Sequence, residues 1–225
     1  DRSQVLDQLR PPAHAPEFSR VFAARTCMMA GVGLTGVFLW YLVRFWVYGK
    51  AVVLTSAPLT IPAGFLIAGM AVATLIGAAL ASWAAGPISE RIEEKNIPVA
   101  RVVAGACLLY AAGLALAWGL GVWSTGTARE NGMLLFALIS GFAFGVYDSL
   151  GLELVMDSLP DPRRAGHDLG IYALANSAGL ALAAIIGALL VNAFEHSFGY
   201  YLLFPSAIVM VLLAGIVTLT TKSAE

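Results

Sequence analysis

Charged residues are scarce in this chain, and their scarcity excludes an ordinary soluble domain. Asp, Glu, Lys and Arg make up 12% of the 225 residues, whereas soluble domains carry about a quarter. The charges are also segregated, so that long apolar stretches carry none. With 59% hydrophobic residues, the composition is typical of a polytopic membrane protein. The net charge of −1 gives no basis for nucleic-acid binding, and we expect none.

Metal-ligand, disulfide and nucleotide-binding patterns are also absent from the sequence. The two cysteines, Cys27 and Cys107, lie in apolar stretches and lack the spacing of a disulfide framework or a metal site. No H-x-x-x-H spacing, paired carboxylates or nucleophile–base pair is visible. No G-x-x-x-x-G-K-[ST] loop occurs, which argues against an ATP-driven pump in this chain. We therefore expect no cofactor and no enzymatic activity.

What the chain does have is a series of apolar stretches, each near the ~20 residues that a ~30 Å hydrocarbon core requires. In lipid each must be helical, because backbone groups find no water to bond. The sequence thus predicts an all-α membrane protein with six transmembrane helices over residues 21–221, between a polar linker or tail (1–20) and a short tail (222–225). The predicted spans are 22–47, 61–85, 99–122, 132–156, 169–193 and 199–221.

The basic residues predict an orientation. If the N-terminus is cytoplasmic, three basic residues lie outside, Arg44, Lys50 and Arg129, and ten lie inside. This positive-inside bias supports a cytoplasmic N-terminus, and an even number of spans makes both termini cytoplasmic. We expect an integral multi-pass protein of the plasma (inner) membrane. The chain begins with Asp1, so we expect a fragment or a numbering that starts inside a longer chain. The ten inside residues are Arg2, Arg10, Arg20, Arg25, Arg91, Lys95, Arg101, Arg163, Arg164 and Lys222.

Three stretches carry a resemblance to a transporter family. "PEFSRVFAARTCMMAGVGLTGVFLWYLV" resembles the start of the family's second half, where an arginine opens the seventh helix. "GVYDSLGLELVMDSLPDPRRAGHDLGIYALANSAG" resembles the end of the tenth helix and the start of the eleventh in sugar or drug transporters. "GPISERIEEK" resembles the cytoplasmic loop motif G-x-x-x-D-R-x-G-x-[RK]-[RK]. In that motif Gly86, Arg91 and Lys95 match, whereas Glu90, Glu93 and Asn96 depart from it.

On these stretches the chain resembles the C-terminal six-helix half of a major facilitator superfamily transporter. The resemblance implies a 3+3 inverted repeat and a rocker-switch cycle around a central cavity. It also implies two partners, an N-terminal six-helix half in the same or another chain and a small-molecule substrate. The first and fourth helices would line the cavity, while the third and sixth would be peripheral. The third and sixth stretches agree, since tyrosine is their only ionisable side chain.

Asp148 is the first candidate for a substrate or proton site. It lies about 24 Å along a helix counted from Gly132, which places it in the cytoplasmic third of the membrane. It shares a helical face with Gly141 and Gly145, and this G-x-x-x-G pair favours close helix approach. An intramembrane carboxylate usually faces a partner, a cavity or water. Asp148 is therefore either a protonation or substrate site, or a structural carboxylate bonded to a neighbouring helix or to Arg25.

Other candidates accompany Asp148. Polar or aromatic side chains of the first, fourth and fifth spans could contact a solute, although helix packing or interfacial anchoring would also explain them. These are Asn176, Tyr147, Trp40 and Tyr41. In the resembling family, charges near the inner surface form a cytoplasmic gate, although solvated interface charges would look the same. The gate candidates are Arg25, Glu90, Arg91, Arg101, Glu153 and Asp157.

Two functions compete. The first is a secondary active transporter that moves a small solute by alternating access, as a symporter or antiporter, with proton coupling as an open extension. The second is a six-helix membrane subunit that binds or scaffolds partner proteins and transports nothing. A transporter should direct Asp148, Asn176 and Tyr147 toward a common aqueous space, whereas a scaffold should bury them in helix contacts.

Overall fold

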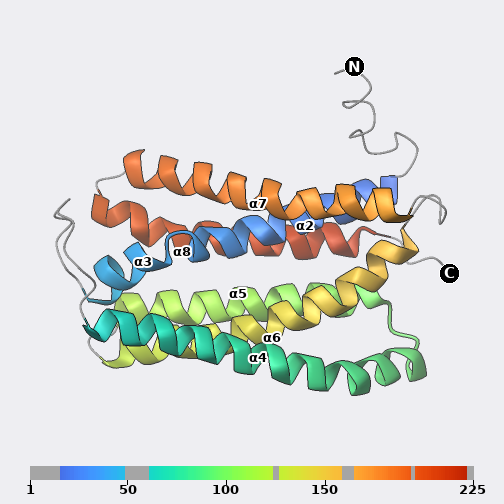
Figure 1. The fold of residues 1–225 in the computed structure, drawn as a ribbon, viewed down its shortest axis with the longest axis horizontal. Coiled ribbons are helices and arrows are strands. Elements are labelled where there is room, and N and C mark those ends of the chain that lie inside the picture. The colour runs from blue at the N-terminus through green and yellow to red at the C-terminus, as the bar shows by residue number, and fades with distance from the viewer. Residues whose placement is uncertain (1–15, 49–60, 124–126, 159–164, 194–195, 222–225) are drawn as a thin grey trace.

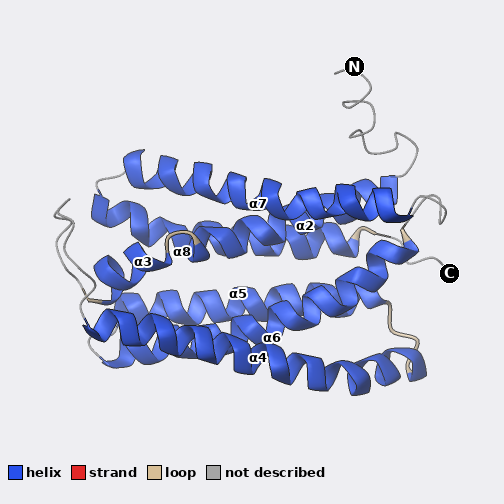
Figure 2. Cartoon of the chain, viewed as in Figure 1, coloured by secondary structure: helices blue, strands red, loops and turns tan. Residues whose placement is uncertain are grey.

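The structure, a computed structural model, describes residues 16–48, 61–123, 127–158, 165–193 and 196–221, and nearly all of them are helical (Figures 1 and 2). Six of the helical spans in these ranges are long and apolar enough to cross a membrane. The predicted fold class is therefore confirmed. The elements are α2 (Pro16–Gly36), α3 (Leu39–Tyr41), the π-helix η1 (Leu42–Val47), α4 (Ile61–Glu94), α5 (Val99–Trp123), α6 (Thr127–Asp157), α7 (Ala165–Ala193) and α8 (His196–Leu219).

The helices form two layers, and in each layer the first helix of one half of the chain packs with the second and third helices of the other half (Figure 1). One layer contains α2 with its extension through α3 and η1, together with α7 and α8, and the other contains α4, α5 and α6. Thus α2 packs against the last two helices of the chain, while α6 packs against α4 and α5. The layers are joined mainly through α5 and α8. This exchange is the arrangement expected of two intertwined three-helix repeats.

Glycines bring the main helix pairs to backbone contact. A Cβ atom on Gly77 would collide with the carbonyl oxygen of Leu138, and one on Gly141 would collide with that of Thr74. A Cβ atom on Gly145 would lie 2.7 Å from the Cβ of Ala81. The predicted close approach at the Gly141–Gly145 pair therefore occurs, between α4 and α6. Without a hydrophobic driving force in lipid, such contacts stabilise the bundle through van der Waals packing.

The first span is not one continuous α-helix. α2 ends at Gly36, and the chain continues through the short α3 into η1, where the Tyr48 N–H bonds to the Val43 carbonyl at 3.2 Å. Single π-helical turns of this kind break the regular ladder and often mark functional segments. The Trp46 indole in η1 packs on Gly121 of α5, where a Cβ atom would occupy the same space. Partial burial and a hydrogen bond to the Glu130 carboxylate raise the pKa of Tyr48 above its ordinary value.

α4 continues well past the predicted span 61–85. The sequence "GPISERIEE" extends the helix to Glu94, so the connection to α5 is only four residues long. Asn96 has a positive φ of 49°, and the Ile97 N–H bonds to the Ile92 carbonyl at 3.0 Å. This six-to-one bond is a Schellman ending, for which asparagine is the usual substitute for glycine.

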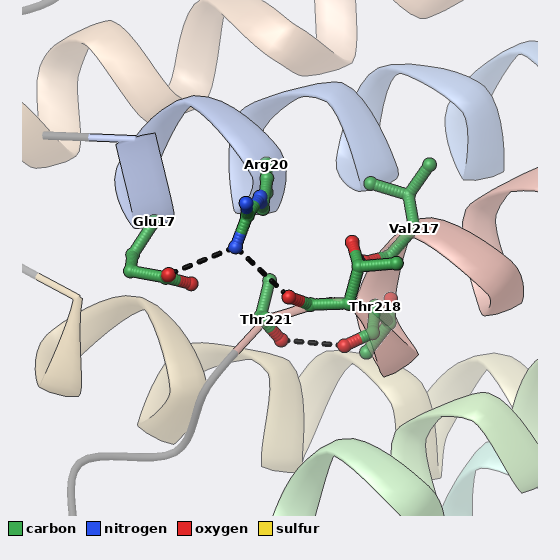
Figure 3. Close-up of polar contacts among 6 residues, drawn as sticks. Glu17, Arg20, Val217, Thr218 and Thr221 are labelled. Carbon is green, nitrogen blue, oxygen red and sulfur yellow. Dashed lines mark hydrogen bonds and ion pairs between the residues drawn. The ribbon is translucent and has the colours of Figure 1, made fainter.

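One end of the bundle holds both the beginning of α2 and the end of α8 (Figure 1). Arg20 joins them, since its Nη1 donates to Glu17 Oε1 at 2.9 Å and to the Thr220 carbonyl oxygen at 3.0 Å (Figure 3). A guanidinium at the C-terminus of a helix complements its dipole. A small apolar cluster closes the interior at this end. Its buried members come from α2, α5 and α6, and they are Val21, Ala100, Leu154 and Val155.

Candidate functional site

Arg25 is the centre of the candidate site. It lies on α2, one turn inward from Val21, and bonds to two other helices. Its Nη1 lies 2.7 Å from Asp148 Oδ1 on α6, and its Nε donates to Asn176 Oδ1 on α7 at 2.7 Å. The two charges differ in exposure, since the Arg25 side chain is 9% exposed and the Asp148 side chain 56%. The predicted alternative in which Asp148 bonds to Arg25 therefore matches the geometry.

Three aromatic rings surround the guanidinium. The Arg25 Cζ lies 5.6 Å from the ring centroids of Phe144 and Tyr147, and 5.7 Å from that of Tyr172. A cation within about 6 Å of an aromatic face is attracted to its quadrupole. Carboxylate, amide and rings together compensate a charge that would otherwise be costly at this depth in a membrane.

A groove of about 390 Å³ opens beside Asp148. Its walls come from α2, α4, α5 and α6, and α6 supplies the largest share. The lining is Val32, Thr74, Ala78, Ser82, Tyr110, Ser140, Gly141, Phe144, Gly145, Asp148 and Ser149. Asp148 is the sole charged residue in this lining, since Arg25 does not border the groove. The site thus has two sides, a packed arginine cluster and an open groove of mixed polar and apolar lining, and the Asp148 carboxylate belongs to both.

The structure brings Asp148, Asn176 and Tyr147 together, but around Arg25 rather than around a common space. Tyr147 is 3% exposed and lies under the guanidinium, while Asn176 is half-buried and bonded to Arg25. Of the three, Asp148 alone borders the groove. Asp148 also lies beyond the tight seam at Gly141 and Gly145, with its side chain open to the groove.

The aromatic candidates lie far from this cluster. Tyr41 follows Arg25 by sixteen residues, or about 24 Å of helix, toward the opposite end of the bundle. Its ring stacks on Tyr200, with centroids 6.1 Å apart, and on Phe45, with centroids 6.2 Å apart. Trp40 is half-buried beside it on α3. The structure therefore does not combine these two residues with Asp148 in one site.

The other gate candidates lie at the end of the bundle that holds the start of α2. Glu90, Arg91, Arg101 and Glu153 are all exposed there. Among the residues that the structure describes, no ion pair joins any two of these four. Asp157 ends α6, and its side chain lies outside the described part of the chain. The ion pair between Arg25 and Asp148 lies deeper in the bundle and includes none of Glu90, Arg91, Arg101 and Glu153.

Sequence reasoning missed most of the groove and two of the rings around Arg25. Thr74, Ala78 and Ser82 recur every four residues, which places them on one face of α4. Without knowing that this face meets α6, the pattern alone gave no reason to connect it with Asp148. Phe144 and Tyr172 gave no signal either, because single aromatic residues are common in apolar helices.

The six apolar helices define an integral, multi-pass membrane protein that lies in a lipid bilayer. A sequence model of the Major Facilitator Superfamily matches residues 62–225, and the chain belongs to that family. Membership implies a transporter of small solutes, and the family is generally non-enzymatic. No curated protein and no solved structure matches the chain.

Proposed function

We propose that the chain acts as the C-terminal half of a secondary transporter, which moves a small solute by alternating access together with an N-terminal six-helix half. The start of α2 and the end of α8 would both face the cytoplasm, in a protein of the plasma (inner) membrane. The start of α2, the end of α4 and the start of α5 meet at that end of the bundle (Figure 1). These element ends, with the α4–α5 connection, carry Arg20, Arg91, Lys95 and Arg101, whereas η1 and the start of α6 carry Arg44 and Arg129 at the other end, which supports this orientation.

The observation that carries the mechanism is the bridge that Arg25 makes between the layers. α2 packs mainly on α7 and α8, yet its Arg25 reaches Asp148 on α6, in the other layer. The apolar cluster of Val21, Ala100, Leu154 and Val155 closes the same end one turn away. Ion pair and cluster together hold the two layers of this half against each other at the proposed cytoplasmic end.

Protonation of Asp148 is the proposed coupling step. Its side chain is 56% exposed, so a proton can reach it from the groove while Arg25 stays buried. Neutral Asp148 would no longer balance the guanidinium, which would remain held by Asn176 and the three rings. The layers would then separate more easily at this end. A proton gradient would drive the cycle in this way.

The test is flux in proteoliposomes that contain the complete transporter, with an imposed pH gradient and a panel of small solutes, read as solute-dependent proton movement. We expect Asp148→Asn to abolish coupled flux and Asp148→Glu to retain part of it. Glu94→Gln is the matched control, because it removes an exposed carboxylate at the end of α4. Coupled flux that persists in Asp148→Asn with unchanged pH dependence would show that Asp148 does not carry the proton.

A further inference from the structure

Three of the five hydroxyl groups of the groove are oriented to accept hydrogen bonds from a ligand. These three, on Thr74, Ser140 and Ser149, give their protons to backbone carbonyls one turn earlier in their own helices, a common arrangement for serine and threonine in membrane helices. The bonds are Thr74 Oγ1 to Met70 O at 2.9 Å, Ser140 Oγ to Ala137 O at 3.0 Å and Ser149 Oγ to Gly145 O at 2.9 Å. With the protons committed, the oxygen lone pairs remain for a ligand. Ser82 and Tyr110 are the other hydroxyl groups of the lining.

The charge of the groove, like its hydroxyl groups, favours a ligand that donates hydrogen bonds. Asp148 contributes the one charged group of the lining, and an ionised carboxylate only accepts hydrogen bonds. One of its oxygens, Oδ1, is bonded to Arg25, and the second is available on a side chain that is more than half exposed. A cation in the groove therefore meets the carboxylate at contact distance and the guanidinium only behind it. An anion would meet the carboxylate and the hydroxyl lone pairs first.

The remainder of the lining is apolar. Val32, Ala78 and the Phe144 ring border the groove together with Gly141 and Gly145. The volume of about 390 Å³ lies within the range of about 300–1,000 Å³ that is typical of small-molecule sites. A ligand that combines one set of N–H donors with an apolar body would match both parts of this lining.

We propose that the groove binds a primary or secondary organic ammonium ion, with its N–H groups on the free oxygen of Asp148 and its apolar part against Val32 and Phe144. This inference rests on the proposed function, because it names the class of solute that would be carried. It excludes organic anions, and it ranks uncharged alcohols below amines of the same shape, since an alcohol offers the carboxylate only a hydrogen bond, whereas an ammonium ion adds the attraction between opposite charges.

The experiment compares three probes of one shape by calorimetry on the purified complete transporter: phenethylamine, phenethyl alcohol and phenylacetate. At pH 7 the amine is protonated and the acid ionised. We expect the amine to bind about tenfold more tightly than the alcohol, and phenylacetate to bind most weakly. Asp148→Asn should reduce amine binding to about the level of the alcohol and weaken alcohol binding much less, because the alcohol loses no attraction between opposite charges. Glu94→Gln should change neither, and Ala78→Leu should weaken both because it fills the groove.

Equal loss of amine and alcohol binding in Asp148→Asn would mean that the substitution merely deforms the site, and it would overturn the proposal. So would tighter binding of the alcohol or of phenylacetate in the unchanged protein. Amine binding that Ala78→Leu does not weaken would place the site elsewhere. The binding proposal and the transport proposal can be refuted independently. Flux of a solute that is not an amine would overturn this inference alone, and Asp148-dependent amine binding without any coupled flux would overturn the transport proposal alone.

Discussion

Because Arg25 and Asp148 are unequally buried, we expect removal of Asp148 to cost more stability than removal of Arg25. Asp148→Ala leaves a guanidinium that is 9% exposed without its counter-charge. Breaking a fully buried pair by removing one partner costs about 3–5 kcal/mol. Because Asp148 is 56% exposed, solvent screening reduces this, and we expect a loss of about 2 kcal/mol in the free energy of unfolding. That loss is roughly a thirtyfold change in the folded-to-unfolded ratio.

Arg25→Met should destabilise the protein less than Asp148→Ala. It keeps the apolar stem of the side chain and leaves Asp148 as a carboxylate that water from the groove can solvate. Its loss is limited to the Asn176 hydrogen bond and the contacts with three rings, so we expect about 1 kcal/mol. In the double variant no unbalanced guanidinium remains, and its loss should also be about 1 kcal/mol. The cycle then gives a coupling energy of about 2 kcal/mol.

The assay is equilibrium unfolding of the four proteins in mixed micelles at increasing dodecyl sulfate, followed by circular dichroism. The order of stability is the decisive result, because it does not depend on the absolute scale. If Arg25→Met proves costlier than Asp148→Ala, or if the coupling energy falls below about 0.5 kcal/mol, the argument from unequal burial is refuted.

Two further predictions concern packing at the α4–α6 contact and ionisation at the end of the bundle opposite the start of α2. Gly141→Ala should lower the apparent melting temperature, with a loss of about 1–3 kcal/mol from overpacking, because its Cβ atom would collide with the Thr74 carbonyl of α4. Gly105→Ala, which meets nothing within 4 Å, is the control and should be neutral or stabilising; equal effects at both positions would contradict the seam. The pKa of Tyr48 is raised by partial burial and by Glu130, so its contribution to stability is present below its ordinary pKa of about 10 and lost as pH rises through the higher folded value. The stability difference between the unchanged protein and Tyr48→Phe should therefore shrink from pH 9 to pH 11, and a constant difference would exclude the effect.

Much of the fold could be predicted because the membrane imposes simple requirements on the sequence. Apolar runs of sufficient length had to be helices, and the spacing of Gly141 and Gly145 was enough to indicate a close helix contact. The helical course of "GPISERIEE" could not be foreseen, because exposed charges between two apolar runs fit a loop and a helix extension equally well. The break after Gly36 was also missed, since an apolar run of 26 residues carries no sign of a π-helical turn.

The candidate site could be predicted only in part. A carboxylate within an apolar helix identified Asp148, and Arg25 was named as a partner, because charges in lipid must be compensated. The arrangement around them depends on which helices meet, and hydropathy does not determine that. Tyr147 was expected near a cavity, yet the rotation of α6 places its ring under Arg25. The groove hydroxyls were missed because α4 and α6 meet only after folding.

The exchange of helices between the layers has a consequence for biosynthesis. Arg25 and Asn176 are separated by 151 residues, and α2 packs on α7 and α8, which are synthesised after α4, α5 and α6. At about 5–20 residues per second, α2 exists for roughly 8 to 30 s before Asn176 is made. During that interval its arginine has neither of its two bonding partners for most of the time. The nascent helix must therefore be kept beside the insertion machinery or near the lipid headgroups, and cells that lack such assistance should degrade the chain before α7 and α8 are made.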